Sequence, residues 1–371
     1  MNYRNTMIAV LIVATLLFSL FTIVVSSSEG LTLSAKSAAL YDPSTKTFIL
    51  EKNSSARLPM ASTTKIMTAL VALEHAGLDD TVIIDERAQG IEGSSAYLTS
   101  GDKYTLEEML YALMLASAND AAVAIACTVC GSVEDFVHLM NEKCDELSLE
   151  NTHFENPSGL DADGHYTTAK DLAILAAVAL ENDTFRTLCA THRKSIGNDS
   201  GTRHLVNHNK LLKQYQGAIG VKTGYTKKCG RCLVSAAERN GVSLVAVTLD
   251  APDDWQDHKR MLDFGFDNLT PTDIAKSGEY NFKIPILFSD NEFVMAQNIS
   301  GFKVPLRKDA KINYDVQIPP YITLTVKKGD IVGKIRFTVD EKLIGGIDIV
   351  STENYENINK RGLFSKFSIK K

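Results

Sequence analysis

The chain contains three short motifs, in a fixed order, whose side chains together could carry out acyl transfer. They are S-T-T-K at Ser62–Lys65, S-A-N at Ser117–Asn119 and K-T-G at Lys222–Gly224. These motifs supply two serine hydroxyls, two lysine amines and an amide. A serine hydroxyl is a poor nucleophile at neutral pH unless a neighbouring base removes its proton, and a lysine whose pKa is lowered can act as that base. The motifs therefore predict a serine enzyme that uses lysine where others use histidine.

The first motif is expected at the start of a helix. Pro59 precedes it, apolar residues follow it with helical spacing, and Gly77 marks the end of the pattern. Residues three apart share a helix face, so the amine of Lys65 can reach the hydroxyl of Ser62. Backbone N–H groups at a helix start also favour an oxyanion. Ser62 is thus the predicted nucleophile and Lys65 its base.

The second and third motifs could complete the site. Ser117 could relay a proton to the leaving amine, and Asn119 could hydrogen-bond a substrate amide. Lys222 would lower the pKa of the first-motif lysine and attract an anionic substrate. Thr223 lies where a strand edge could pair with a peptide, and Gly224 would let a substrate approach the backbone closely.

Each motif alone is a weak signal. A second S-x-x-K occurs at Ser368–Lys371 and an S-D-N at Ser289–Asn291, and we interpret both as chance matches. The ordered set gains its weight from its surroundings. A helical run with a capping box, Thr105–Leu115, precedes the second motif, and two strand patterns at 232–237 and 242–249 follow the third.

Longer segments surround the motifs, at 58–69, 114–122, 156–160, 165–173 and 220–228. With these segments the sequence resembles the low-molecular-mass penicillin-binding proteins, the serine D-alanyl-D-alanine carboxypeptidases of peptidase family S11. The resemblance covers the chain from about Ala38 to Leu269 and, more loosely, the remainder.

The resemblance implies an activity and a role for each motif. The enzyme would remove the terminal D-alanine from peptidoglycan stem peptides through an acyl-enzyme on Ser62, with Lys65 as general base and Ser117 with Asn119 as the second element. β-Lactam antibiotics, which mimic that terminus, would acylate Ser62.

The resemblance also implies how substrate is bound. Lys222 and Thr223 would hold its terminal carboxylate, and the backbone N–H groups of Ser62 and Tyr225 would form the oxyanion hole. Several relatives carry an arginine near the segment that is Asp253–His258 here, and this segment is acidic. Carboxylate recognition through an arginine is therefore not predicted.

Two other functions fit the same fold. A serine β-lactamase needs a carboxylate that activates water, but segment 156–164 matches the carboxypeptidases, and Asp161 and Asp163 are interpreted as turn residues. A low-turnover penicillin-binding or sensor module would need no efficient hydrolysis. The intact motifs favour the enzyme, and turnover of a D-Ala-D-Ala peptide distinguishes the two.

The N-terminus predicts export. Arg4 precedes an apolar stretch from Met7 to Val25, which is typical of a secretory signal, either cleaved or kept as an anchor. The protein is expected outside the cytoplasm, at the outer face of the bacterial cytoplasmic membrane. The basic tail 359–371 could form an amphipathic helix on a membrane surface or be a disordered tail. The net charge of −6 gives no indication of nucleic-acid binding.

Six cysteines in an exported chain raise the question of disulfides and metal. The pairs Cys127/Cys130 and Cys229/Cys232 have the C-x-x-C spacing of zinc ligands, yet they lie far apart in sequence and in helix and strand patterns. Buried free thiols are the preferred interpretation, a disulfide is the alternative, and no metal or cofactor is predicted.

The pattern of elements predicts an α/β (α+β) fold. A hairpin at 38–51, helices from Ser62 to about Asn182, strands from Ile219 and a helix at 255–264 indicate one antiparallel sheet with a helical cluster, as in the β-lactamase/transpeptidase-like domain. Short β-rich runs after Pro271, one of them at 322–326, predict a small all-β domain. The predicted division is 1–29 signal or anchor, 30–270 catalytic domain, 271–355 β domain and 356–371 basic tail.

Overall fold

The computed structural model describes residues 31–198 and 201–356. The predicted signal or anchor, most of the predicted basic tail and the chance motif at 368–371 lie outside these residues. No single helix in the described ranges is long and apolar enough to cross a membrane, and only the bent pair Asn119–Cys130 with Val133–Glu146 meets that criterion jointly.

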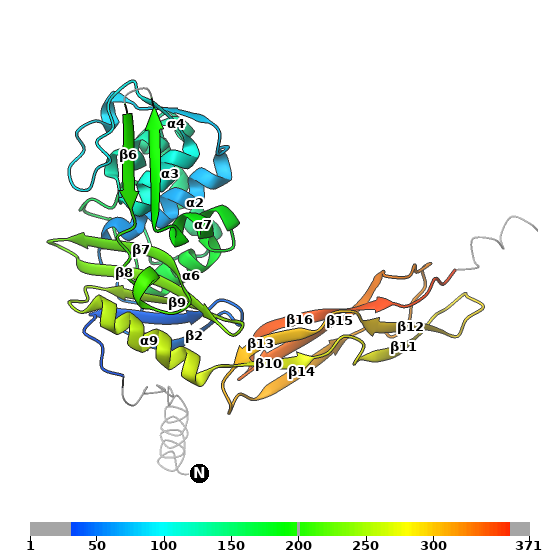
Figure 1. Ribbon diagram of the computed structural model, residues 1–371. Coiled ribbons are helices and arrows are strands. Elements are labelled where there is room, and N and C mark those ends of the chain that lie inside the picture. The colour runs from blue at the N-terminus through cyan, green and yellow to red at the C-terminus, as the bar shows by residue number, and fades with distance from the viewer. Residues whose placement is uncertain (1–30, 199–200, 357–371) are drawn as a thin grey trace, which may run out of the picture. The chain divides into compact units, whose positions relative to one another are not determined.

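One antiparallel sheet forms the centre of the catalytic region (Figure 1). Its strand order is β2(Thr47–Lys52), β1(Ser37–Asp42), β9(Val242–Leu249), β8(Gly230–Arg239) and β7(Ala218–Thr226). Strand β1, the first of these in the sequence, pairs with β9, the last, and Ser37 lies opposite Leu249. Strands β1 and β9 are apolar and buried on both faces, which requires helices on each side of the sheet.

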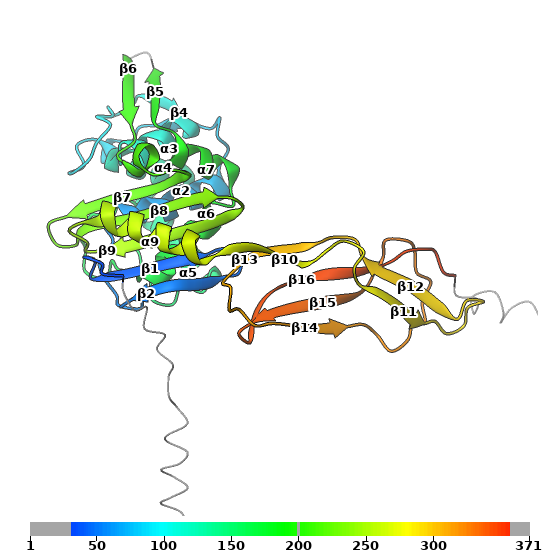
Figure 2. The same ribbon diagram turned by 60° about the horizontal axis from the view of Figure 1, so that its bottom comes forward.

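The helices supply that cover (Figure 2). Helix α9(Asp254–Asn268) packs on β8 and β9, and α6(Ala169–Ala179) packs on β1 and β9 from the other face. The remaining elements of this region are η1(Ala61–Thr64), α2(Lys65–His75), β3(Thr81–Ile83), η2(Glu86–Ala88), β4(Lys103–Thr105), α3(Leu106–Leu115), α4(Asn119–Cys130), α5(Val133–Glu146), α7(Asp183–Ala190), β5(Arg193–Asn198), β6(Gly201–Val206) and α8(Leu211–Gln214).

Local sequence explains most of these boundaries. The predicted capping box forms at the start of α3, where Thr105 and Glu108 satisfy each other's backbone N–H groups. The prediction that the first motif opens a helix is confirmed, but Ala61–Thr64 forms the 3₁₀ turn η1 and the α-helix itself begins at Lys65. The predicted end of the later helix at Phe264 is wrong, because α9 continues to Asn268. Gly265 lies inside α9, and a Cβ there would come within 2.5 Å of the Leu244 side chain, so the position requires a glycine for packing.

The C-terminal β region has two sheets. One pairs β10(Thr270–Ala275) with β13(Phe302–Leu306), and the other has the order β11(Asn281–Pro285), β12(Phe293–Asn298), β16(Lys342–Ser351), β15(Ile331–Val339), β14(Ile312–Gln317). Phe302 stacks on Phe337 in its core, with ring centroids 5.3 Å apart. The predicted strand 322–326 is wrong: only isolated bridges form at Ile322 and Val326, and Leu324 between them is 72% exposed.

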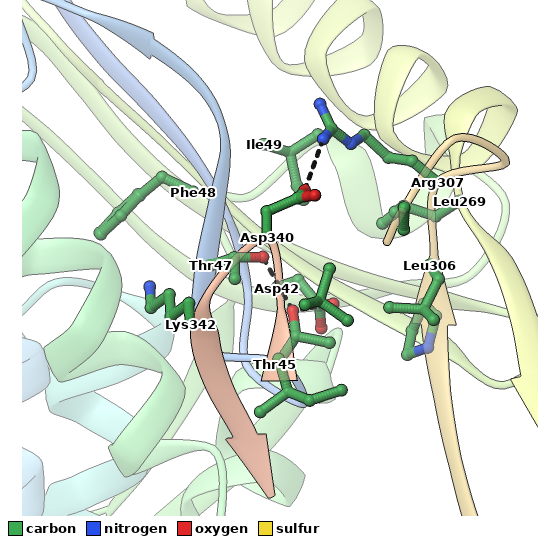
Figure 3. Close-up of a pocket in the computed structure, with 14 residues that line it drawn as sticks. Asp42, Thr45, Thr47, Phe48, Ile49, Leu269, Leu306, Arg307, Asp340 and Lys342 are labelled. Atoms are coloured by element: carbon green, nitrogen blue, oxygen red, sulfur yellow. Dashed lines mark hydrogen bonds and ion pairs between the residues drawn. The ribbon is translucent and has the colours of Figure 1, made fainter. Parts of the chain in front are cut away.

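A pocket between the β1–β2 turn and strands of the β region holds none of the motif residues (Figure 3). Its charged groups satisfy each other: Arg307 pairs with Asp340 at 3.0 Å, and Thr45 donates to Asp42 at 2.6 Å. We therefore assign no chemistry to it. The S-D-N sequence at Ser289–Asn291 lies in the turn between β11 and β12 and brings no group to the other motifs.

Candidate active site

The turn that carries Ser62 is enclosed by two glycines. Gly159 has φ +86°, and a Cβ there would lie 2.0 Å from the carbonyl oxygen of Ala61. A Cβ on Gly224 would lie 3.1 Å from the backbone nitrogen of Ser62. The missing side chain of Gly224 therefore lets its strand approach the Ser62 turn closely. The start of Tyr225 then lies beside the Ser62 N–H.

The amine of Lys65 lies in a fully buried position with three oxygen partners. Its Nζ is 3.0 Å from Ser62 Oγ, 2.6 Å from Asn119 Oδ1 and 2.5 Å from the carbonyl oxygen of Ser158. The amide and carbonyl oxygens can only accept, so a neutral amine would donate its two hydrogens to them. Its lone pair would then face the remaining partner, the Ser62 hydroxyl, which can donate.

The pKa of Lys65 supports the neutral form. Burial lowers it well below its usual value, and the neighbouring Lys222 lowers it further, while Asp120 acts in the opposite direction. The effect of Lys222 is expected from the sequence. The arrangement can therefore remove the proton of the Ser62 hydroxyl.

The second pair consists of Ser117 and Lys222. Ser117 lies between α3 and α4 with a left-handed φ of +59°, which aims its hydroxyl at Lys222. The Lys222 Nζ is 3.0 Å from Ser117 Oγ and 3.0 Å from the carbonyl of Thr223. Burial lowers the pKa of Lys222 to about 7, so its charge is sensitive to pH near neutrality.

The side-chain amide of Asn119 is engaged in hydrogen bonds inside the site. Its Oδ1 accepts from Lys65, and its Nδ2 donates to the carbonyl of Glu92 at 2.7 Å. Its backbone N–H donates to the carbonyl of Ser94, also at 2.7 Å. The amide therefore orients the base and the loop before any substrate is bound.

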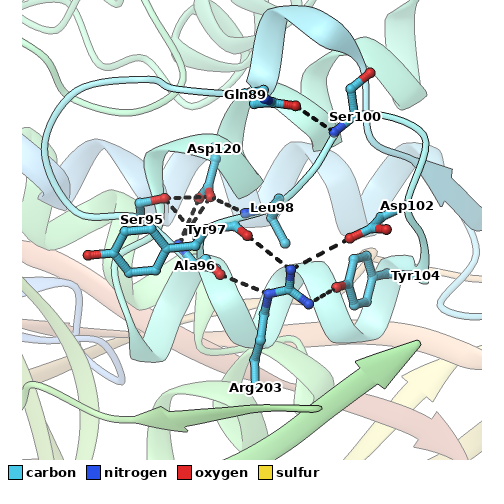
Figure 4. A network of polar contacts seen from close by, with 10 residues as sticks. All are labelled: Gln89, Ser95, Ala96, Tyr97, Leu98, Ser100, Asp102, Tyr104, Asp120 and Arg203. Carbon is cyan, nitrogen blue, oxygen red and sulfur yellow. Dashed lines mark hydrogen bonds and ion pairs between the residues drawn. The ribbon is translucent and has the colours of Figure 1, made fainter. Parts of the chain in front are cut away.

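Two charged residues that the sequence did not indicate as functional hold the loop beside Asn119 (Figure 4). Asp120 accepts from the backbone N–H groups of Ala96 and Leu98, each at 3.0 Å. Arg203 on β6 donates to the carbonyls of Ala96 at 3.0 Å and Tyr97 at 2.9 Å. Asp120 adjoins the second motif and could have been suspected, whereas nothing in the sequence linked Arg203 to this loop.

We expect Arg203→Met to loosen this loop. The substitution keeps the length of the side chain but removes all its donors, so the free energy of unfolding should fall by about 1–3 kcal/mol. Limited proteolysis should cut between residues 91 and 100 faster than in the wild type. Arg193→Met, which changes an exposed residue of the same hairpin, is the matched control, and equal cleavage of the two variants would contradict this role.

An open cleft of about 340 Å³ adjoins the paired groups. Its lining includes both serines, Thr223, Gly224 and Tyr225, together with Ser94, His208, Lys210, Arg231, Asp254 and Trp255. Thr223 and Tyr225 lie on β7, where a peptide can run alongside. No group of three or more potential metal ligands occurs among the described residues.

The guanidinium of Arg231 does line the cleft, although the sequence did not indicate this residue. Arg231 lies on β8, opposite Tyr225 in the β7–β8 register, and pairs with Asp254 at 2.9 Å. Burial raises the pKa of Asp254, and Arg231 opposes that shift. The acidic segment 253–258 thus holds an arginine in the cleft although it contains none itself.

The two aspartates considered for β-lactamase chemistry are engaged elsewhere. Asp161 accepts from Thr226 at 2.9 Å, and Asp163 is exposed and lies 3.7 Å from Lys228. Asn156 closes the preceding turn by accepting three backbone N–H groups. Segment 156–160 therefore contributes the Ser158 carbonyl to Lys65 and brings no carboxylate to it.

Comparisons with known proteins find relatives over most of the chain. A family model described as D-alanyl-D-alanine carboxypeptidase matches residues 24–253, and one described as penicillin-binding protein 5, C-terminal domain, matches residues 272–357. The D-alanyl-D-alanine carboxypeptidase DacF of Bacillus subtilis is 32% identical over 86% of this chain and 85% of its own length. DacC of Escherichia coli is 30% identical over 88% and 86%.

Solved structures show the same fold. Penicillin-binding protein 5 of Haemophilus influenzae superposes with a TM-score of 0.72 at 24% identity, covering 89% of this chain and all of that one. A mutant of the Streptomyces K15 DD-transpeptidase gives a TM-score of 0.61 at 34% identity, covering 64% of this chain and all of that one.

Proposed function

This chain belongs to the peptidase S11 family of serine D-alanyl-D-alanine carboxypeptidases, and we propose that its reaction runs through Ser62, Lys65, Ser117 and Lys222. The observation that carries the proposal is the buried Lys65 amine, 3.0 Å from the Ser62 hydroxyl and with a strongly lowered pKa. The substrate is a peptide that ends in D-Ala-D-Ala.

Acylation begins when neutral Lys65 takes the proton of Ser62. The Ser62 oxygen attacks the carbonyl of the penultimate D-alanine, and the backbone N–H groups of Ser62 and Tyr225 stabilise the oxyanion. Ser117, hydrogen-bonded to Lys222, gives its proton to the leaving D-alanine amine and takes the proton held by Lys65, so Lys65 is neutral again. Water then attacks the ester and gives a proton to Lys65, which passes it to Ser62 as the ester bond breaks, and the shortened peptide is released.

Substrate binding uses one cation buried behind the wall of the cleft, Lys222, and one that lines it, Arg231. Lys222 and Thr223 hold the terminal carboxylate, and the peptide lies along the edge of β7. Arg231 adds a guanidinium at the same end of the cleft, screened by its pairing with Asp254. β-Lactams bear a carboxylate in the corresponding place and acylate Ser62 in the same way.

Penicillin should label Ser62 covalently, because a β-lactam mimics the acyl-D-alanine terminus. Intact-mass spectrometry should show one adduct on the wild-type protein and none on Ser62→Ala, and peptide mapping should place the adduct on Ser62. Ser94→Ala, which removes another hydroxyl of the cleft, is the matched control and should label normally. An adduct that survives Ser62→Ala would refute this nucleophile.

Turnover separates this enzyme from a penicillin-binding sensor on the same fold. The wild-type protein should release D-alanine from diacetyl-Lys-D-Ala-D-Ala over many cycles, whereas a sensor would stop after acylation. Rapid hydrolysis of excess penicillin would instead favour a β-lactamase. The carboxylate that activates water for deacylation would then have to belong to a residue other than Asp161 or Asp163.

Members of this family act on the cell wall outside the cytoplasm, and we infer that this chain is held at the outer face of the membrane. The apolar stretch Met7–Val25 and the basic tail 359–371 support this inference. A form lacking residues 1–29 should bind anionic vesicles less after deletion of 359–371, with unchanged turnover of a soluble peptide. Equal vesicle binding by the two forms would show that the tail is not an anchor.

A further inference from the structure

Two cysteines lie together in the hairpin that carries the third motif. Cys229 is in the β7–β8 turn and Cys232 is on β8, and the two residues are 3% and 0% exposed. Cys232 Sγ lies 4.0 Å from the carbonyl oxygen of Cys229, the hydroxyl of Thr226 lies 2.9 Å from Cys229 Sγ, and each thiol shifts the pKa of the other. The proposed reaction makes no use of either thiol.

The pair lies directly behind the catalytic turn. Cys232 is opposite Gly224 in the β7–β8 register, and its Sγ is 3.8 Å from the carbonyl oxygen of Pro59. Gly224 in turn contacts the backbone at Ser62. A covalent change at the two sulfurs therefore acts on the strand and the turn that together supply the proposed oxyanion hole.

The two thiols differ in acidity. The hydrogen bond with Cys232 lowers the pKa of Cys229 to about 7 against the opposing effect of burial, and raises that of Cys232. By contrast, burial raises the pKa of Cys127 and Cys130, which share the same C-x-x-C spacing on α4. A thiolate is the attacking species in thiol–disulfide exchange. Cys229 lies in the turn next to exposed residues, with the Thr226 hydroxyl on its sulfur, whereas Cys232 lies within β8, so Cys229 is the attacking partner.

We propose that Cys229 and Cys232 form a thiol–disulfide modification site that alters acylation at Ser62. The Cys229 thiolate attacks one sulfur of an external disulfide, forms a mixed disulfide and releases a first thiolate. Cys232 then loses its proton and attacks Cys229 Sγ, which closes the internal S–S bond and releases a second. The external disulfide gains two electrons, and the two protons end on the released thiols.

The hairpin turn is both the route of access and the part that must move. Lys227 and Lys228 beside Cys229 are exposed, so local opening of the turn presents its sulfur to the reagent. An S–S bond of about 2.05 Å is much shorter than a hydrogen-bonded contact between sulfurs. Cys232 is held in the sheet, so Cys229 and its turn must shift, and Tyr225 lies next to that turn.

The test treats the purified, folded protein with excess hydroxyethyl disulfide and reads intact mass and peptide maps. The wild type and the double variant Cys127→Ser/Cys130→Ser should both lose two hydrogens and yield a linked Cys229–Cys232 peptide. Cys232→Ser should stop at a hydroxyethyl mixed disulfide on Cys229, and Cys229→Ser should give no internal bond. Absence of the link, or a link between Cys127 and Cys130, would overturn the site.

Penicillin labelling then tests the coupling to Ser62. The oxidised wild type should acylate several-fold more slowly than the reduced protein and recover on treatment with a thiol reductant. Cys229→Ser should show no such change. Equal rates before and after oxidation would overturn the coupling. Formation of the disulfide is measured by mass spectrometry alone. This result therefore does not depend on whether Ser62 is the nucleophile.

Discussion

Lys65→Arg should reduce penicillin acylation by about 10²- to 10⁴-fold, the usual contribution of a general base. Arginine is a longer basic side chain that stays protonated and cannot release a proton in this pH range, so it cannot act as the base. The Lys65 amine contacts three oxygen atoms. Two of them can only accept hydrogen bonds, so the lone pair of the neutral amine faces the Ser62 hydroxyl. Stopped incubation with penicillin, followed by intact-mass spectrometry, measures the rate.

Two controls keep this result interpretable. Because the site is fully buried, the larger guanidinium could disturb the fold, so circular dichroism and thermal unfolding must accompany the assay. Lys65→Met fills similar space without a charge and should be folded and equally slow. Acylation near the wild-type rate by either folded variant would place the base elsewhere.

Lys222→Gln should change two separate observables. The positive charge of Lys222 lowers the pKa of Lys65, so its removal raises that pKa and moves the rising limb of the acylation rate to higher pH. The pKa of Lys222 is itself about 7, so its charge is largest below that pH and the shift should be most evident there.

The second observable is the preference for a free carboxylate. Wild-type enzyme should favour peptides with a free C-terminus over amidated ones, and this preference should weaken as the pH rises through about 7, where Lys222 loses its charge. The Lys222→Gln variant should show little preference at any pH. Steady-state kinetics with matched free and amidated peptides measure the ratio of kcat/KM.

Lys227→Gln is the control for both observables. It removes the same charge from an exposed position in the β7–β8 turn, so any general effect of net charge appears in it. A Lys222→Gln variant that behaves like Lys227→Gln in both assays would remove Lys222 from the site.

The sequence alone was sufficient for features that depend on local order. Helical spacing, the capping box at Thr105 and the two strand patterns after the third motif predicted the elements that carry the motifs, because these signals act over a few residues. The order of the motifs indicated serine acyl transfer with lysine as the base. The α/β fold with a following all-β domain followed from the change in periodicity near Pro271, and the comparisons confirm it.

Tertiary structure decided which atoms meet. Lys65 contacts the Ser158 carbonyl across 93 positions, and Arg203 reaches the Ala96 carbonyl across 107. Such contacts depend on the packing of helices and the register of strands, which local patterns do not encode. The same reason applies to Arg231 beside Asp254: its place in the cleft follows from its pairing opposite Tyr225 on β7.

The cysteines show most clearly what the sequence determines and what the tertiary structure determines. Their spacing gave Cys127/Cys130 and Cys229/Cys232 the same pattern in the sequence. In the fold, a helix holds the first pair, whose thiol pKa values are raised by burial, while a hairpin brings the second pair into mutual contact behind Gly224. Sequence determined which groups are available for chemistry, and the packing of distant segments, through burial and contact, determined which of them are reactive.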